Sequence, residues 1–378
     1  MAGKMVTTSI LQTLVAMGLN ALRERIVMPR LVNRDYEDMI TGAKKGSTVN
    51  VAVPAAVAVR SVTPDVVPPA TSAVTPTSVP VTLSQWNEAP FIMDDKGINQ
   101  VDAGILPMQA SEAIKSLANT IDQYLWGFYK KFYGYAGVAG TTPFATDVSA
   151  YLDARKFANA QLMDPDPRWM LIDEVAEANA LGLRAFQDAS FRGDTEGIVN
   201  GTIGRKLGAN WVMTQNVPTH TKGGEDGNYV INNGTIIVGT TTITVDGGTG
   251  TILEGDIFTL AGDTQTYVVI STVGGGTVTS ITFAPGLKIE TVNEYALTFK
   301  SGGPQNLLLH REAIAFAMAP LAEQKLLGGE GVSVAIDEES GLSLRLEITR
   351  QYKQYQWAWD ALYGAAVIRK EYGVRIAG

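Results

Sequence analysis

The stretch from residue 219 to 300 constrains the fold of this 378-residue chain more than any other feature. It contains 14 of the 39 glycines and 18 threonines, and its charged side chains are three lysines and eight carboxylates. Short runs of β-branched and aromatic residues alternate with Gly-rich turns, which is typical of a small antiparallel barrel or sandwich. Helical patterns flank the stretch, so we expect an inserted domain. The predicted strands are 236–238, 242–245, 257–260, 267–270, 278–283 and 295–299.

The composition excludes several kinds of chemistry. The chain has no cysteine, which rules out disulfides, thiol nucleophiles and cysteine zinc sites. Its net charge of −8 argues against a nucleic-acid binder that works through a basic surface. No apolar run is long enough to predict a membrane span. We interpret residues 9–22 as part of an amphipathic helix, which ends near Met28 and Pro29, rather than as the core of a signal peptide.

Catalytic and metal-binding motifs are missing from the sequence. No phosphate-binding loop, nucleophile elbow or zinc-protease motif occurs, and the only two histidines, His220 and His310, are 90 positions apart. We therefore predict no catalytic residues, no cofactor-binding residues, no metal ligands and no cofactor, and we expect that the protein is not an enzyme. Missing motifs alone do not exclude an enzyme, because two carboxylates that are far apart in the sequence can form a catalytic pair in the folded chain.

Residues 46–93 form a second unusual segment. The ranges 48–53 and 78–83 alternate as strands do, and six prolines between residues 54 and 80 disfavour a helix. From residue 46 to 87 the only charged side chains are Arg60 and Asp65. The pattern predicts an extended β-hairpin that packs either on its own subunit or on a neighbouring one. We prefer the second, because large exposed apolar edges usually mark an interface.

Helical periodicity is clearest after this hairpin. Apolar residues recur every three or four positions from Ala110 to Phe132, which predicts one helix over 108–133, about 39 Å long at 1.5 Å per residue. The N-terminal 45 residues carry seven basic and four acidic side chains, typical of a solvated helix face or of an arm against a neighbour. The remaining predictions are helices at 149–162, 174–186 and 312–322, strands at 169–172 and 342–348, and Gly-rich turns leading into a strand at 197–217.

The order of these segments resembles that of the major capsid proteins of tailed bacteriophages, which have the Hong Kong 97-like fold. Residues 307–318 (LLLHREAIAFAM) are similar to a stretch near the end of that family's axial domain. Residues 360–364 and 369–376 resemble its closing turn and strand. Residues 253–262 (LEGDIFTLAG) are similar to a strand pair in the inserted β-domain of podophage-type coat proteins.

The resemblance implies an α+β chain with an N-terminal arm, an extended β-hairpin loop, a long spine helix, peripheral and axial domains, and an inserted small antiparallel β-barrel. The family's covalent crosslink needs a matched Lys, Asn and Glu, which cannot all be placed here, so none is predicted. The implied divisions are the arm at 1–45, the extended loop at 46–93, the peripheral domain with the spine helix at 94–148, the first part of the axial domain at 149–218, the inserted barrel at 219–300, and the rest of the axial domain with the return to the peripheral domain at 301–378.

The resemblance also implies a structural function. We expect a major capsid protein that assembles with itself into hexamers and pentamers of an icosahedral shell around double-stranded DNA, without sequence-specific DNA binding or a membrane. Scaffolding and portal proteins would be its other partners, and the virion capsid, assembled in the host cytoplasm, its location. In the podophage branch a charged loop of the inserted domain can make contacts between capsomers. The candidate intersubunit residues are Arg60, Asp65, Trp86, Lys222, Glu225 and Asp226.

Two other functions fit parts of the sequence. The same fold would serve an encapsulin-like compartment, in which case a cargo enzyme would be encoded nearby in place of a portal or scaffolding protein. Alternatively, residues 219–300 would recognise glycans in a secreted β-rich protein, and exposed aromatic side chains would be its mark. The aromatic residues of that stretch lie mostly at strand positions that favour a core.

Overall fold

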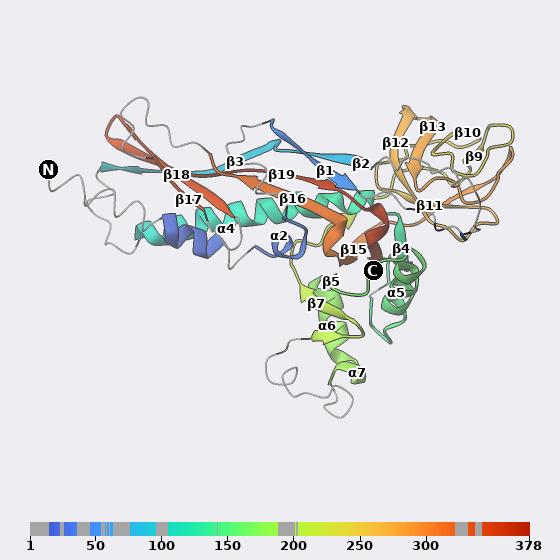
Figure 1. Ribbon diagram of the computed structural model, residues 1–378, viewed down its shortest axis with the longest axis horizontal. Helices are drawn as coiled ribbons and strands as arrows, with labels where there is room; N and C mark the ends of the chain where they lie inside the picture. The colour runs from blue at the N-terminus through green and yellow to red at the C-terminus, as the bar shows by residue number, and fades with distance from the viewer. Residues whose placement is uncertain are drawn as a thin grey trace. The chain divides into compact units, whose positions relative to one another are not determined.

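The computed structural model describes residues 15–22, 26–35, 46–53, 57, 59, 61–62, 76–95, 105–141, 143–187, 201, 203–321, 332–336 and 342–378. Strands predominate over helices, and the expected α+β class is confirmed (Figure 1). The chain divides into two compact units, which are described separately below. The first comprises residues 1–24, 34–117 and 314–368, and the second comprises residues 25–33, 118–313 and 369–378.

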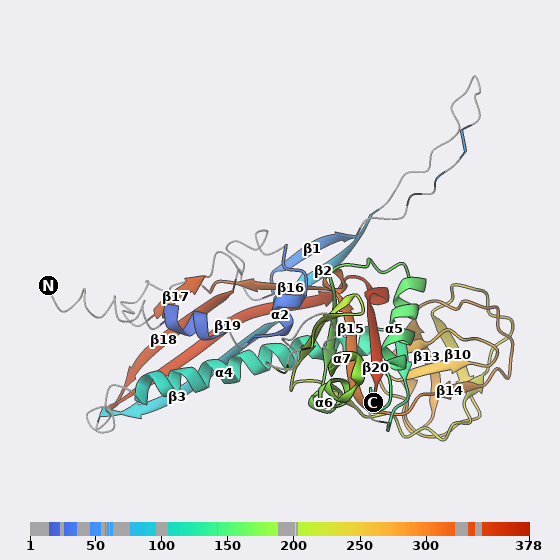
Figure 2. The same ribbon diagram turned by 90° about the horizontal axis from the view of Figure 1, so that it is seen from below.

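The first unit is organised around the long strand β19. One side of β19 pairs with β3, and the other side pairs first with β18 and then with β16, while β17 pairs with β18. A separate antiparallel pair, β1 and β2, forms the expected hairpin (Figure 2). The strands are β1 Thr48–Val53, β2 Thr77–Thr82, β3 Gln85–Asp94, β16 Ile314–Ala319, β17 Val332–Ile336, β18 Ser343–Gln351 and β19 Gln354–Val367.

Helices cover one face of this sheet. Residues 15–22 are helical, and the helix α4, Ile105–Trp126, contributes its residues up to 117 to the first unit. A Cβ atom at Gly18 would lie within 3.0 Å of both Trp359 on β19 and Ile114 on α4. The absence of a side chain at Gly18 therefore lets the two helices and the sheet pack closely together.

The second unit contains a seven-stranded mixed sheet. The strand order is β4-β20-β15-β5-β7-β6, and β8 pairs with the first residues of β15. Its strands are β4 Gly134–Gly137, β5 Arg168–Ile172, β6 Gly204–Lys206, β7 Ala209–Met213, β8 Thr219–His220, β15 Gly303–His310 and β20 Gly373–Ala377. Its helical segments, besides the end of α4, are α2 Met28–Leu31, η2 Gly127–Lys131, α5 Ser149–Ala160, α6 Glu174–Gly182, α7 Arg184–Gln187, η3 Arg311–Ala313 and η4 Lys370–Tyr372.

Residues 229–299 of the second unit form a small antiparallel barrel, as the Gly- and Thr-rich pattern predicts. The strand order is β14-β11-β12-β13-β10-β9, and a bridge between Val230 and Ala296 brings β9 back to the segment just before β14. Phe258 lies at the centre of its core, where it contacts three other aromatic rings. The strands are β9 Val230–Ile231, β10 Thr242–Asp246, β11 Ile257–Leu260, β12 Tyr267–Gly274, β13 Val278–Ala284 and β14 Leu297–Phe299.

Several element predictions need correction. The predicted helix 312–322 is wrong: a single 3₁₀ turn, η3, is followed by the strand β16. All six residues of β16 are buried, and Ala315, Ala317 and Ala319 face the base of the hairpin. Their small size suits this close packing, which overrides the helix preference of alanine. In place of the strand 236–238, Ile236 forms an isolated bridge with Thr291.

The predicted helix boundaries also shift. The helix 108–133 begins earlier, at Ile105, and ends at Trp126, after which η2 tightens the backbone. The helix 174–186 divides into α6 and α7 because the backbone at Leu183 is extended. Asp173 begins α6 by accepting a hydrogen bond from the backbone N–H of Ala176 at 3.1 Å.

Candidate functional site

The hairpin β1–β2 exposes apolar side chains beyond its base. At the base, Val51 and Val81 are buried against β16 and β19. Farther along, Val57, Val59 and Val62 are 70%, 98% and 88% exposed. Exposed apolar surface of this kind usually marks a contact with another molecule. The candidate residues Arg60 and Asp65 lie outside the described residues.

Trp86, a third candidate, is held on β3 by two charged neighbours. Its indole N–H donates to Asp360 Oδ2 at 2.8 Å, and the Arg345 guanidinium lies 5.8 Å from its ring centroid. Arg345 also donates from Nε to Asp360 Oδ1 at 2.9 Å and from Nη2 to Oδ2 at 2.5 Å. Burial lowers the pKa of Arg345, but the hydrogen bond and charge of Asp360 outweigh it and raise the pKa overall.

This arrangement makes Trp86 a preorganised contact. Asp360 is 3% exposed, whereas the Trp86 residue is 48% exposed. Because the indole N–H is already bonded within the chain, the exposed part of the ring could pack against another molecule without leaving a polar group unpaired. The role of Trp86 between subunits stays a prediction.

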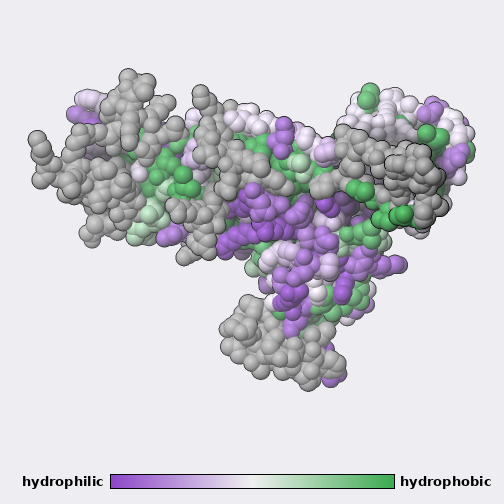
Figure 3. Space-filling model, in the orientation of Figure 1, coloured by the Kyte–Doolittle hydropathy of each residue, from purple (hydrophilic) through white to green (hydrophobic). Residues whose placement is uncertain are grey.

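The three candidates near the start of the barrel divide into two sets. Lys222 donates to Glu225 Oε1 at 2.5 Å. Asp226 accepts hydrogen bonds from the backbone N–H of Asn228 at 3.1 Å and from the Thr249 hydroxyl at 3.0 Å. The backbone N–H groups of Asn228 and Thr249 lower the pKa of Asp226 to about 2. The surface of the barrel carries hydrophobic and hydrophilic side chains interspersed with one another (Figure 3). The contact of Lys222, Glu225 and Asp226 with another subunit stays a prediction.

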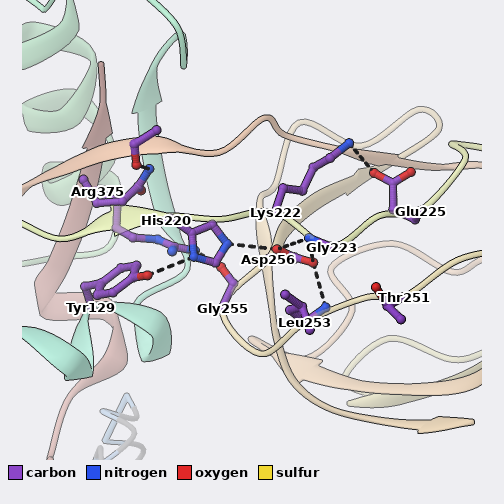
Figure 4. Close-up of polar contacts among 12 residues, drawn as sticks. Tyr129, His220, Lys222, Gly223, Glu225, Thr251, Leu253, Gly255, Asp256 and Arg375 are labelled. Atoms are coloured by element: carbon purple, nitrogen blue, oxygen red, sulfur yellow. Dashed lines mark hydrogen bonds and ion pairs between the residues drawn. The ribbon is translucent and has the colours of Figure 1, made fainter. Parts of the chain in front are cut away.

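Sequence reasoning missed a buried polar cluster where the barrel joins the seven-stranded sheet (Figure 4). We call it the root cluster, and it consists of Tyr129, His220, Asp256 and Arg375. His220 Nε2 donates to Asp256 Oδ1 at 2.9 Å, and His220 Nδ1 lies 2.9 Å from the Tyr129 hydroxyl. These side chains come from η2, from β8, from the residue before β11 and from β20. The cluster therefore joins the sheet, its flanking turn and the barrel by polar bonds.

Asp256 is the centre of the root cluster. It is fully buried, and besides His220 it accepts hydrogen bonds from the backbone N–H groups of Leu253 at 2.8 Å and Gly223 at 3.2 Å. Several donors aimed at one carboxylate compensate for its removal from water. The cluster is thus built to hold structure, and its burial keeps it from any large substrate.

Arg375 completes the root cluster from the sheet. Its Nη2 donates to the backbone carbonyl of Gly255 at 2.7 Å, and its guanidinium lies 5.5 Å from the Tyr129 ring centroid. Burial lowers the pKa of Arg375 to about 10, and at this value the guanidinium is still charged at neutral pH. Gly255 has a φ of +94°, a backbone conformation that favours glycine and that lets its carbonyl take part in this bond.

The described residues offer little else to a ligand. Among them, no group of three or more histidines and carboxylates could hold a metal ion. No helix in the described ranges has both the length and the apolar character needed to cross a membrane.

Comparisons with known proteins concern the fold. No family model and no curated protein sequence matches the chain. A solved structure described as Mycobacterium phage Che8 has 15% sequence identity and a TM-score of 0.52, and the match covers 93% of this chain and 90% of that one. The chain has an α+β fold that matches the folds of phage capsid structures.

Two further solved structures are similar at lower scores. The capsid structure of the cyanophage P-SCSP1u has 11% identity and a TM-score of 0.49, with 92% of this chain and 89% of that one covered. The virus-like particle from Pyrococcus furiosus has 9% identity and a TM-score of 0.42, with 97% and 98% covered. The podophage-type branch of the capsid fold stays a prediction.

Proposed function

We propose that this chain is a major capsid protein of a tailed bacteriophage and has no catalytic function. In this proposal it assembles into hexamers and pentamers of an icosahedral shell that encloses double-stranded DNA, in the host cytoplasm. The observation that carries the proposal is the capsid fold over nearly the whole chain. The net charge of −8 supports an enclosing wall that does not bind DNA tightly.

The proposal assigns a role to each segment. Residues 1–45 would form the arm, 46–93 the extended loop, 94–148 the peripheral domain with the spine helix, and 149–218 with 301–378 the axial domain and the return to the peripheral domain. Residues 219–300 would be the inserted barrel, which stabilises the axial domain through the root cluster. Scaffolding and portal proteins would assist assembly, because subunits that meet at several different angles need a guide to one shell size.

The exposed valines of the hairpin would make the main intersubunit contact. Val57, Val59 and Val62 expose apolar surface that a monomer would leave in water, and a neighbouring subunit would cover it. Trp86 offers a second contact, held in place by Asp360 and Arg345. A hairpin that reaches a neighbour and a fixed aromatic ring suit a shell in which the same surfaces repeat.

Sedimentation of matched variants tests this proposal. The triple variant Val57→Ser, Val59→Ser and Val62→Ser should fold as the parent chain does but remain small in a sucrose gradient, while the parent sediments as shells. A control variant, Val273→Ser with Ile237→Ser, removes two apolar side chains of the barrel that are 64% and 70% exposed, and it should still form shells. Shells from the hairpin variant would contradict the assigned contact, and small species from the parent in all conditions would contradict the function.

A further inference from the structure

The chain has only two histidines, and both are buried. His220 belongs to the root cluster, and His310 ends β15 in the seven-stranded sheet. Histidine is the side chain whose ordinary pKa lies nearest neutrality, so these two are the natural candidates for a response to mild acid. Their hydrogen-bond partners differ in a way that decides which of them can respond.

The partners of His220 accept a protonated ring. Its Nε2–H donates to the Asp256 carboxylate, which can only accept. Its Nδ1 lies beside the Tyr129 hydroxyl, which can either donate or accept. If Nδ1 gains a proton, the hydroxyl turns and accepts instead, and the cluster stays intact.

The partner of His310 does not accept a protonated ring. Its Nδ1 accepts a hydrogen bond from the backbone N–H of Glu312 at 3.2 Å. A backbone N–H is only a donor, so a proton on Nδ1 would set two donors against each other. The protonated ring therefore cannot keep this bond, and the turn η3 that follows would lose it.

The charged and titratable groups around His310 come from three elements. Arg168 begins β5 and Asp164 lies in the loop before it, Glu312 lies in η3, and Tyr372 lies in η4, with its ring centroid 5.2 Å from that of His310. The Tyr372 hydroxyl in turn donates to Asp164 Oδ2 at 3.2 Å and accepts from Arg369 Nη1 at 2.9 Å. No carboxylate hydrogen bond to His310 is present among these described contacts.

His310 also lies where the chain leaves and re-enters the second unit. That unit ends at Ala313 in one connection and resumes at Arg369 in the other. Within the unit these two ends are bonded, because the backbone N–H of Arg369 donates to the carbonyl of Ala313 at 3.3 Å. We call the residues 310–313 and 369–372 the paired turns. The His310–Glu312 bond and the His310–Tyr372 ring contact both stabilise them.

We propose that His310 is an acid-sensitive switch that loosens the paired turns when its ring is protonated. Loosening them frees the backbone of residues 310–313 and 369–372 within the second unit. A device of this kind would let mild acid open the paired turns without opening the barrel.

The electrostatics give the direction of the response. Burial lowers the pKa of His310, and it outweighs the backbone carbonyl of Asp166 and the carboxylates of Asp164 and Glu312, which raise the pKa. The folded state thus binds fewer protons than the opened state just below pH 6.5, so acid favours opening. At pH 5.5, one unit below the reference pKa of about 6.5, the opened fraction should rise by up to about tenfold.

Hydrogen exchange of the full chain tests the switch. Peptides spanning 307–316 and 366–376 should lose up to about tenfold in protection between pH 7.5 and pH 5.5, after correction for the intrinsic exchange rate. In His310→Asn this loss should disappear, because the amide oxygen can accept from Glu312 N–H and takes no proton. In the control His220→Gln, whose amide can donate to Asp256, the loss should remain.

The outcomes separate the switch from a general acid effect. Equal pH dependence in the parent and His310→Asn would overturn the proposal, as would disappearance of the response in His220→Gln. If His310→Asn fails to fold, the parent alone decides: peptides of the barrel, such as 243–260, should keep their protection while the paired turns lose theirs. A loss of protection that is equal in the barrel and the paired turns, or no loss in the paired turns, would overturn the proposal. The measurement does not require that the chain form shells.

Discussion

Replacing Asp256 by asparagine tests whether the root cluster holds the barrel to the sheet. The change keeps the size of the side chain and one oxygen, but it removes the charge and introduces an N–H₂ group. That group must replace either Oδ2, where it meets the N–H groups of Leu253 and Gly223, or Oδ1, where it meets the Nε2–H of His220 unless that ring changes tautomer. The variant therefore either leaves a buried donor unpaired or forces His220 into its other tautomer, and in both cases the remaining bonds lose the charge of the carboxylate.

The expected cost follows from these contacts. A hydrogen bond to a charged group contributes about 1.5–3 kcal/mol, and an unpaired buried donor costs about 1–3 kcal/mol. The longer Gly223 contact at 3.2 Å counts for less than the contacts of Leu253 and His220, at 2.8 and 2.9 Å. We expect Asp256→Asn to lower the free energy of unfolding by about 2–4 kcal/mol.

Scanning calorimetry of the purified chain at pH 7.5 measures this cost. At about 2–4 °C per kcal/mol for a folding unit of 150–250 residues, Tm should fall by about 4–16 °C. The matched control is Asp226→Asn, the same chemical change at an exposed carboxylate that also accepts a backbone N–H. Its Tm should change much less. Equal shifts in the two variants would refute the reasoning, because the root cluster would then hold nothing beyond an ordinary surface bond.

Three further changes test other parts of the account. Asp360→Ala removes the bidentate partner of the Arg345 guanidinium, which keeps the longer contact with Glu347 at 3.6 Å, and it removes the acceptor of the Trp86 indole N–H, so denaturant unfolding should show a loss of about 3 kcal/mol. Phe258→Ala opens a cavity in the barrel core and should lower the barrel's stability by about 3–5 kcal/mol in the same assay. Burial raises the pKa of Asp122 to about 6, although the backbone N–H groups of Val27 and Met28, which donate to the carboxylate, lower it. Between about pH 4 and 6 the folded chain therefore binds more protons at Asp122 than the unfolded chain does. The free energy of unfolding falls as the pH rises through this range. Asp122→Asn should then raise Tm at pH 7.5 and leave it unchanged at pH 4, and an equal effect at both pH values would contradict this.

The strands were the part of the fold most accessible to prediction. The ranges 48–53 and 257–260 match β1 and β11, because alternating or wholly apolar runs bounded by turn residues leave few other possibilities. The barrel itself was predictable for the same reason. The helix predicted at 312–322 failed because its alanines serve close packing under the hairpin, and that packing depends on residues more than 200 positions away.

The candidate site was less predictable than the fold. The root cluster depends on hydrogen bonds between residues 36, 91 and 120 positions apart, so no single stretch of sequence predicts the pairing. His220 and His310 are both buried, but the difference between their hydrogen-bond partners becomes apparent only in the fold. Trp86 lies in the predicted extended loop 46–93, whereas Asp360 and Arg345, which hold it, become its neighbours only through the pairing of β3, β19 and β18.

Electron microscopy of the purified chain, alone and with a scaffolding protein, tests the central claim most directly. The account predicts closed polyhedral shells built of hexamers and pentamers in at least one of these conditions. A chain that is folded yet remains a monomer or small oligomer in both, without shells, would contradict the assignment as a capsid protein.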